Sequence, residues 1–126
     1  MNKNKEIIEA FIAAWSTLDV DLLVSFFAED GVYYNMPTQP VQGHQHLHGF
    51  ITAFLGDWTR TTWDIKTLMA EGDVVMVERL DRTEIGAVKV DLPCCGVFEM
   101  EDGKIKQWRD YFDLATYTQA LAPPQK

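Results

Sequence analysis

The 126-residue chain is acidic, with 19 Asp and Glu against 11 Lys and Arg and a formal net charge of −8. Such a field repels phosphates and anionic headgroups, so it disfavours nucleic acid and membrane surfaces as partners and favours a neutral small molecule. The length and the 47% hydrophobic content fit a single domain, residues 1–126, around one core.

The first half of the chain reads as helical. An apolar stripe at i, i+1, i+4, i+5 and i+8 predicts a first helix over residues 3–17. Asp19 is the expected N-cap of a second, short helix that closes near residues 30–31. A strand is expected over residues 32–36, followed by a loop and then by a third helix over residues 44–57.

The β signal dominates the second half. Strands are predicted over residues 62–69, 74–81, 87–100 and 105–112, with a short tail helix over residues 114–121. Helices that lead and strands that follow indicate an α+β fold, with helices packed on one face of an antiparallel sheet.

The register of the last hairpin depends on its turn. Residues 101–103 fit a three-residue loop with Gly103 in the left-handed position. That loop would set Cys94 opposite Asp110 and Leu92 opposite Phe112. A two-residue Asp-Gly turn would shift the pairing by one residue, so both registers remain open.

Three strands carry polar residues at two-residue spacing, which sends each set to one face of a sheet. The residues are Tyr33 with Asn35, Arg79 with Asp81, and Asp110 between Trp108 and Phe112. If this is the inner face, two acids are buried together. We expect Arg79 to lie between them and one acid to keep its proton, because an unpaired buried carboxylate is costly.

Such a pair supplies a base and an acid in one pocket. A water that donates to Asp110 and to the Asn35 amide oxygen, and accepts from the Tyr33 hydroxyl, has one lone pair free for attack. Asp110 would take its proton, and protonated Asp81 would donate to a developing alkoxide.

At these residues the sequence resembles the limonene-1,2-epoxide hydrolase family. The resemblance runs from the first helix to Leu121 and is closest in the segments FFAEDGVYYNMP, VERLD and GVFEMEDGKIKQWRDYFDL. It implies a cone-shaped NTF2-like (SnoaL-like, cystatin-like) fold, a curved mixed or antiparallel sheet with the amino-terminal helices on its concave face. It also implies a homodimer that hydrolyses a small epoxide with water, using no metal, no organic cofactor and no covalent intermediate.

The resemblance assigns roles by position. Tyr33 and Asn35 match the pair that holds the water, Asp110 matches the base, Arg79 the bridge and Asp81 the acid. An apolar pocket wall for the substrate is expected from Ile12, Trp15, Phe54, Trp58, Thr83, Leu92, Cys94 and Phe112. Bulky Trp15 and the poorly aligned stretch that holds Phe54 and Trp58 leave the identity of the epoxide open.

Rival interpretations remain. On the same fold, a ketosteroid-isomerase-like or polyketide-cyclase-like enzyme, or a ligand-binding module without turnover, would also have an apolar cone with acids. His44, His46 and His48 alternate in a way that fits metal ligands, although no carboxylates accompany them at suitable spacing.

The adjacent Cys94 and Cys95 are expected to be reduced, because a vicinal disulfide strains the backbone. With no signal-peptide or membrane-spanning pattern, this predicts a soluble, cytoplasmic protein.

Overall fold

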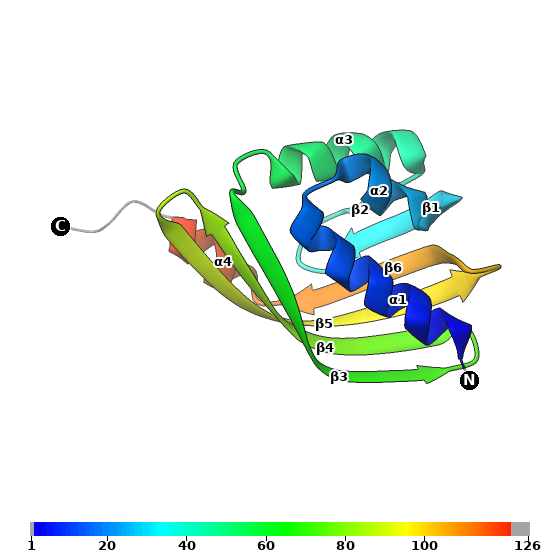
Figure 1. Ribbon diagram of the computed structural model, residues 1–126. Coiled ribbons are helices and arrows are strands. Elements are labelled where there is room, and N and C mark those ends of the chain that lie inside the picture. Colours follow the sequence, from blue (N-terminus) through cyan, green and yellow to red (C-terminus); the bar gives the residue numbers. More distant parts are fainter. Residues whose placement is uncertain (1, 122–126) are drawn as a thin grey trace.

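In the computed structural model, which describes residues 2–121, two helices come first, two strands precede the third helix, and a last helix follows four further strands (Figure 1). The helices are α1 (Lys3–Ala14), the 3-10 turn η1 (Trp15–Thr17), α2 (Val20–Ser25), α3 (His44–Leu55) and α4 (Leu114–Leu121). The strands are β1 (Phe27–Asn35), β2 (Pro40–Gln42), β3 (Arg60–Glu71), β4 (Val74–Ile85), β5 (Val88–Glu101) and β6 (Lys104–Phe112). None of these helices is long and apolar enough to cross a membrane.

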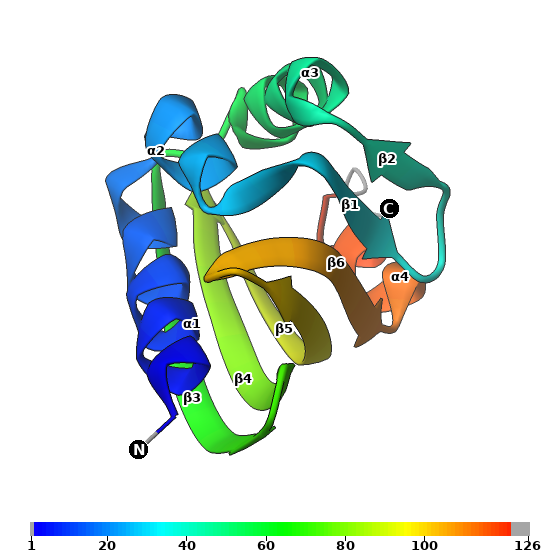
Figure 2. The same ribbon diagram turned by 90° about the vertical axis from the view of Figure 1, so that its right-hand side faces the viewer.

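The six strands form one mixed sheet in the order β2-β1-β6-β5-β4-β3. Every neighbouring pair is antiparallel except β1 and β6, which run parallel. The sheet curves around the helices, with α1 and α3 on its inner side (Figures 1 and 2). The α+β, NTF2-like architecture expected from the sequence is therefore confirmed, with one parallel pair in the sheet.

The apolar stripe of α1 fills the inner face of the sheet. Phe11 is fully buried and meets Phe98 and Trp108 edge-to-face, with ring centroids 5.9 Å and 5.1 Å apart. Trp15 stacks on Trp63 with centroids 4.3 Å apart. Aromatic packing of this kind adds to area burial, so the first helix is fixed firmly against β3 to β6.

The largest differences from the predicted boundaries lie where the second helix meets the first strand. The second helix ends at Ser25, and β1 begins at Phe27 rather than at residue 32. The amide of Ile105 donates to the Phe26 carbonyl at 2.9 Å, so parallel pairing with β6 captures residues that local periodicity assigned to the helix. Pro40 lies on the short strand β2 within the predicted loop, a position that proline tolerates because β2 is at the sheet edge.

Of the two turns that the sequence left open for the last hairpin, the structure has the two-residue turn and not the three-residue loop. Asp102 and Gly103 form a two-residue turn with φ of 51° and 77°, and Glu101 pairs with Lys104. A bulge follows at once, after which Cys94 faces Phe112 and Gly96 faces Asp110. The pairing is thus displaced by two residues from the one predicted.

Candidate active site

The five predicted catalytic side chains meet on the inner face of the sheet. Tyr33 and Asn35 come from β1, Arg79 and Asp81 from β4, and Asp110 from β6. All five are buried, and the parallel register of β1 and β6 sets Asn35 directly beside Asp110. The i, i+2 spacing read from the sequence therefore does bring these groups to one place.

Arg79 bridges the two acids. Its Nε donates to Asp81 Oδ1 at 2.7 Å and its Nη2 to Asp81 Oδ2 at 3.0 Å. On the other side, Nη1 donates to Asp110 Oδ1 at 2.8 Å, and Nη2 also donates to Asp110 Oδ2. The planar guanidinium thus makes a fork to each carboxyl group, an arrangement for which lysine is no substitute.

Two aromatic rings contact the bridge. The guanidinium carbon of Arg79 lies 4.3 Å from the centroid of Trp63 and 5.5 Å from that of Trp108. Trp63 is held in turn, because its Nε1 donates to Thr61 Oγ1 at 3.0 Å and Thr61 shares a 2.8 Å hydrogen bond with Thr83. Cation–π contacts with Trp63 and Trp108 therefore hold the cationic group in place.

The environment favours a proton on Asp81. Burial raises the pKa of Asp81 to about 6, since desolvation outweighs the opposing charge and hydrogen bonds of Arg79. Burial by itself lowers the pKa of Arg79. The negative charges of Asp110 and Asp81 outweigh this effect and hold the pKa well above its usual value. The site therefore keeps a permanent cation next to an acid that titrates close to neutral pH.

Tyr33 is a rigid neutral donor at the same site. Its ring stacks on Trp108 with centroids 4.1 Å apart and an interplanar angle of 3°. Burial, followed by the charge of Asp110, raises the pKa of the Tyr33 hydroxyl well above its ordinary value. The hydroxyl consequently keeps its proton and can donate to a bound water.

A cavity of about 230 Å³ opens onto these groups. Its polar side is formed by Tyr33, Asn35, Asp81 and Asp110. The rest of its lining, mostly aromatic and aliphatic, comes from Thr38, Phe50, Phe54, Trp63, Leu92, Phe112, Leu114 and Tyr117. A small apolar molecule therefore fits beside the acids, and α3 and α4 supply the walls opposite the sheet.

The predicted pocket wall is only partly at this cavity. Phe54, Leu92 and Phe112 line it, as expected from the resemblance. The other five residues predicted for the wall do not line it, for physical reasons that differ. Ile12 and Trp15 are buried in the core beneath the site, and Trp58 lies behind Tyr117, to whose hydroxyl its Nε1 donates at 3.2 Å.

The last two predicted wall residues support other side chains. Thr83 is turned to Thr61, and Cys94 is turned to Asp81. The Thr83 hydroxyl and the Cys94 thiol thus each have a buried hydrogen-bond partner. Neither side chain reaches the cavity surface.

Some of the residues at the site were missed. Phe50 lies one helical turn before Phe54 on α3, and Tyr117 lies on the tail helix, so their i, i+4 and amphipathic spacings were the available signals. Gly96 faces Asp110 in mid-strand, and a Cβ there would lie 2.9 Å from both Arg79 Nη1 and Asp110 Oδ1. A glycine inside a strand is the sequence sign of such a close approach.

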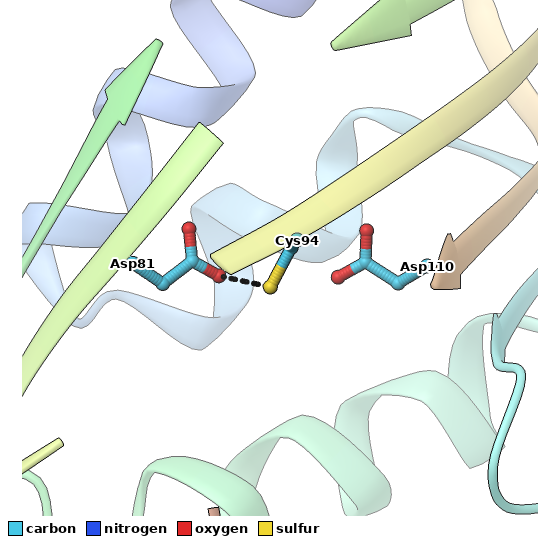
Figure 3. Close-up of side chains that lie close together, drawn as sticks. All are labelled: Asp81, Cys94 and Asp110. Atoms are coloured by element: carbon cyan, nitrogen blue, oxygen red, sulfur yellow. Dashed lines mark hydrogen bonds between the residues drawn. The ribbon is translucent and has the colours of Figure 1, made fainter. Parts of the chain in front are cut away.

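Asp81, Cys94 and Asp110 lie close enough to suggest a metal site, with one ligand atom from each within 4.8 Å of the others (Figure 3). The donors already present argue against it. Each of the four carboxylate oxygens accepts a hydrogen bond from Arg79. A divalent cation would have to displace a buried guanidinium, so these residues do not fit a metal.

The three histidines have separate partners. His44 Nε2 lies 2.8 Å from the Phe27 carbonyl oxygen, and His46 Nδ1 lies 3.1 Å from the carbonyl oxygen of Gln42. His48 Nε2 lies 3.0 Å from Asp21 Oδ1. Within residues 2–121 they do not converge on a common point, and they lie apart from the cavity.

Comparisons with known proteins identify the family. Residues 2–122 match the family described as the limonene-1,2-epoxide hydrolase catalytic domain. The chain belongs to the limonene-1,2-epoxide hydrolase family. It is 34% identical over 109 residues to the epoxide hydrolase EphG of Mycobacterium tuberculosis, covering 85% of this chain and 71% of that protein.

Solved structures agree with this assignment to the limonene-1,2-epoxide hydrolase family. An LEH-like epoxide hydrolase from M. tuberculosis superposes with a TM-score of 0.81 at 31% identity, covering 94% of this chain and 88% of that one. A putative SnoaL-like polyketide cyclase from Shewanella denitrificans superposes with a TM-score of 0.86 at 13% identity, covering 96% and 98%. The second likeness shows only that the fold is shared.

Proposed function

We propose that this protein hydrolyses a small apolar epoxide to a vicinal diol in one step, without a metal, an organic cofactor or a covalent intermediate. The observation that carries the proposal is the buried Asp81–Arg79–Asp110 bridge at the polar end of a cavity whose remaining walls are mostly apolar. Membership of an epoxide hydrolase family supports the same reaction class.

Asp110 is the base in this proposal. A water held by the Asp110 carboxylate, the Asn35 amide oxygen and the Tyr33 hydroxyl attacks one epoxide carbon, and Asp110 accepts a proton from it. Arg79 and the Trp108 indole, whose Nε1 donates to Asp110 Oδ1 at 3.1 Å, keep the carboxylate in position. Fixing the water in this way supplies the positioning that a bimolecular attack lacks.

Asp81 is the acid. As the ring carbon–oxygen bond breaks, Asp81 gives its proton to the oxygen, so the leaving group departs as an alcohol rather than an alkoxide. With a pKa of about 6, half of Asp81 is protonated at about pH 6 and about a tenth of it at pH 7, far more than for an ordinary aspartate. One proton enters Asp110 and one leaves Asp81, and the pair is reset when a proton passes back between them.

Substitution of the acids tests these roles. Asp110→Asn and Asp81→Asn preserve shape and should each lower diol formation by a factor on the order of 10²–10⁴. Asp91→Asn is the matched control, because Asp91 is an exposed carboxylate on β5 outside this cavity. A folded Asp110→Asn or Asp81→Asn protein with a near-normal rate would remove that residue from the mechanism.

Isotope labelling tests the absence of a covalent intermediate. In a single turnover in ¹⁸O-labelled water, direct attack puts the label into the diol at once. An ester to Asp110 would instead place an unlabelled carboxylate oxygen in the first diol. Mass spectrometry of product formed by excess enzyme distinguishes the two.

A panel of epoxides separates this function from its rivals. Cyclopentene oxide, cyclohexene oxide and limonene oxide are small cyclic epoxides of different size, so together they test which size the cavity accepts. Formation of a diol from any of them excludes a binding module without turnover. A ketosteroid-isomerase-like enzyme would leave all three unchanged and would instead exchange a proton at carbon.

We also propose that the chain forms a homodimer. The outer face of the sheet exposes large apolar side chains, including Met69 at 70% and Met76 at 47% of their surface. These two residues are cross-strand neighbours on β3 and β4, so they form one patch. Light scattering should give twice the 14.4 kDa chain mass. Met76→Glu puts a charge in the patch, so it should lower the measured mass toward that of one chain.

A further inference from the structure

Cys94 is buried beside Leu92 in a small apolar cluster, and its side chain also faces the acids. It pairs with Arg79 across β4 and β5, and its sulfur points into the space between the two acids (Figure 3). The sulfur is 3.4 Å from Asp81 Oδ2 and 3.5 Å from the Leu92 carbonyl oxygen. A thiol has one hydrogen, so it can donate to only one of these acceptors at a time.

The thiol is suited to donate and unsuited to react. Burial, opposed by Arg79 and aided by the charges of Asp81 and Asp110, raises the pKa of the Cys94 thiol far above its ordinary value. Cys94 is not among the residues that line the cavity, although both acids that it faces are. It therefore stays a neutral S–H group that acts on its neighbours.

The two acids differ in their neutral donors. Besides Arg79, Asp110 accepts from the Trp108 indole N–H at 3.1 Å, whereas among residues 2–121 the other donor to Asp81 is the Cys94 S–H. An S–H is a weak donor compared with an N–H. Asp81 therefore has the weaker neutral donor, which fits its role as the acid.

We propose that Cys94 is a positioning residue for the acid, holding the Asp81 carboxyl in place and setting the pH at which it loses its proton. While Asp81 is protonated, the thiol turns to the Leu92 carbonyl. When Asp81 gives its proton away, the thiol turns to Asp81 Oδ2 and donates to the new carboxylate. No bond to sulfur forms or breaks, and Cys94 carries no net charge throughout.

Within the described residues, other titratable or polar groups also face Asp81 or its cavity. Arg79 is on the same strand, Asp110 comes from β6, and Tyr33 reaches the site from β1. Tyr117 brings a hydroxyl to the cavity from α4, and Trp63 from β3 is uncharged. Cys94 is the donor to Asp81 that can be exchanged without removing one of the charged groups.

A substitution series tests the proposal directly. Cys94→Ser keeps the shape but supplies a stronger O–H donor, and Cys94→Val keeps most of the volume but supplies none. Relative to the unchanged protein, we expect the Asp81 pKa to fall by about one unit in Cys94→Ser and to rise by about half a unit in Cys94→Val. The readout is the ¹³C chemical shift of the Asp81 carboxyl across a pH titration.

The adjacent cysteine is the matched control. Cys95 is half-buried, and Cys95→Ser should leave the Asp81 titration unchanged. Equal Asp81 titrations in the Ser, Cys and Val forms, or the reverse order, would overturn the proposal. If Cys94→Val does not fold, Cys94→Ala takes its place as the variant without a donor.

The role in turnover rests on the proposed function, and a second measurement keeps the two apart. The alkaline limb of kcat/KM for diol formation should move in the same order as the carboxyl titration. If the carboxyl titration shifts but no variant opens an epoxide, the hydrogen bond stands and the proposed function fails. If epoxides are opened and the titration does not move, the assignment of Cys94 fails alone.

Discussion

Gly96→Ala places one methyl group against the centre of the proposed active site. The Cβ would lie 2.9 Å from Arg79 Nη1, 2.9 Å from Asp110 Oδ1 and 3.0 Å from Trp108 Nε1. These atoms are not free to withdraw, because Nη1 and the indole N–H both donate to the same Asp110 oxygen, at 2.8 Å and 3.1 Å. Ordinary contact requires a retreat of about half an ångström by groups that are held from several sides.

The cost should appear in both activity and stability. Because a displacement of this size misplaces the base, we expect kcat/KM for diol formation to fall roughly 100-fold. Overpacking should lower the free energy of unfolding by about 1–3 kcal/mol, measured by urea denaturation. Gly96 needs no positive φ, so the backbone itself tolerates alanine.

Gly49→Ala is the control for this prediction. Gly49 lies on α3, and a Cβ there meets no atom within 4 Å. Activity should not change, and the helix should gain about 0.5–1 kcal/mol. A folded Gly96→Ala protein with wild-type kcat/KM would refute the view that this glycine makes room for the base and its bridge.

Three further predictions concern Arg79 and Asp81 on β4. Arg79→Lys keeps the charge but loses the double fork, so diol formation should fall at least tenfold and thermal unfolding should come at a lower temperature. Because Asp81 must be protonated to act, kcat/KM should fall as pH rises through about 6. The pKa of Asp81 is raised on folding from 3.8 to about 6, so the unfolding free energy should fall by about 2 kcal/mol between pH 4 and 7, and Asp81→Asn should lack this change.

The sequence predicts the helices and the polar cluster well, because both follow from local periodicity. The stripe that includes Phe11 and Trp15 is buried as expected, and Arg79 and Asp81 share one face because they are two residues apart. The short helix that should have continued to Asp30 ended at Ser25 instead. There, pairing with a strand some 80 residues later decided the outcome, and no local pattern carries that information.

The cavity wall was the least predictable part. Whether Trp15 or Trp63 reaches the cavity depends on how α1 crosses the sheet, since the two rings stack on each other and only Trp63 is at the surface of the cavity. Likewise, Tyr117 reaches the cavity only because the tail helix folds back against β5. These facts concern the packing of elements, which residue spacing within each element does not determine.

The hairpin register shows why the predicted polar side chains nevertheless meet on one face. The tight turn at Asp102 and Gly103 moves the pairing by one residue, which alone would send either Cys94 or Asp110 to the outer face. The bulge places Lys106 as an extra residue on β6, since Glu99 pairs with Gln107 while Met100 pairs with Ile105. The turn and the bulge each shift the pairing by one residue, so together they return Cys94 and Asp110 to the same face. The bulge therefore allows a two-residue turn and an inward Asp110 in one hairpin.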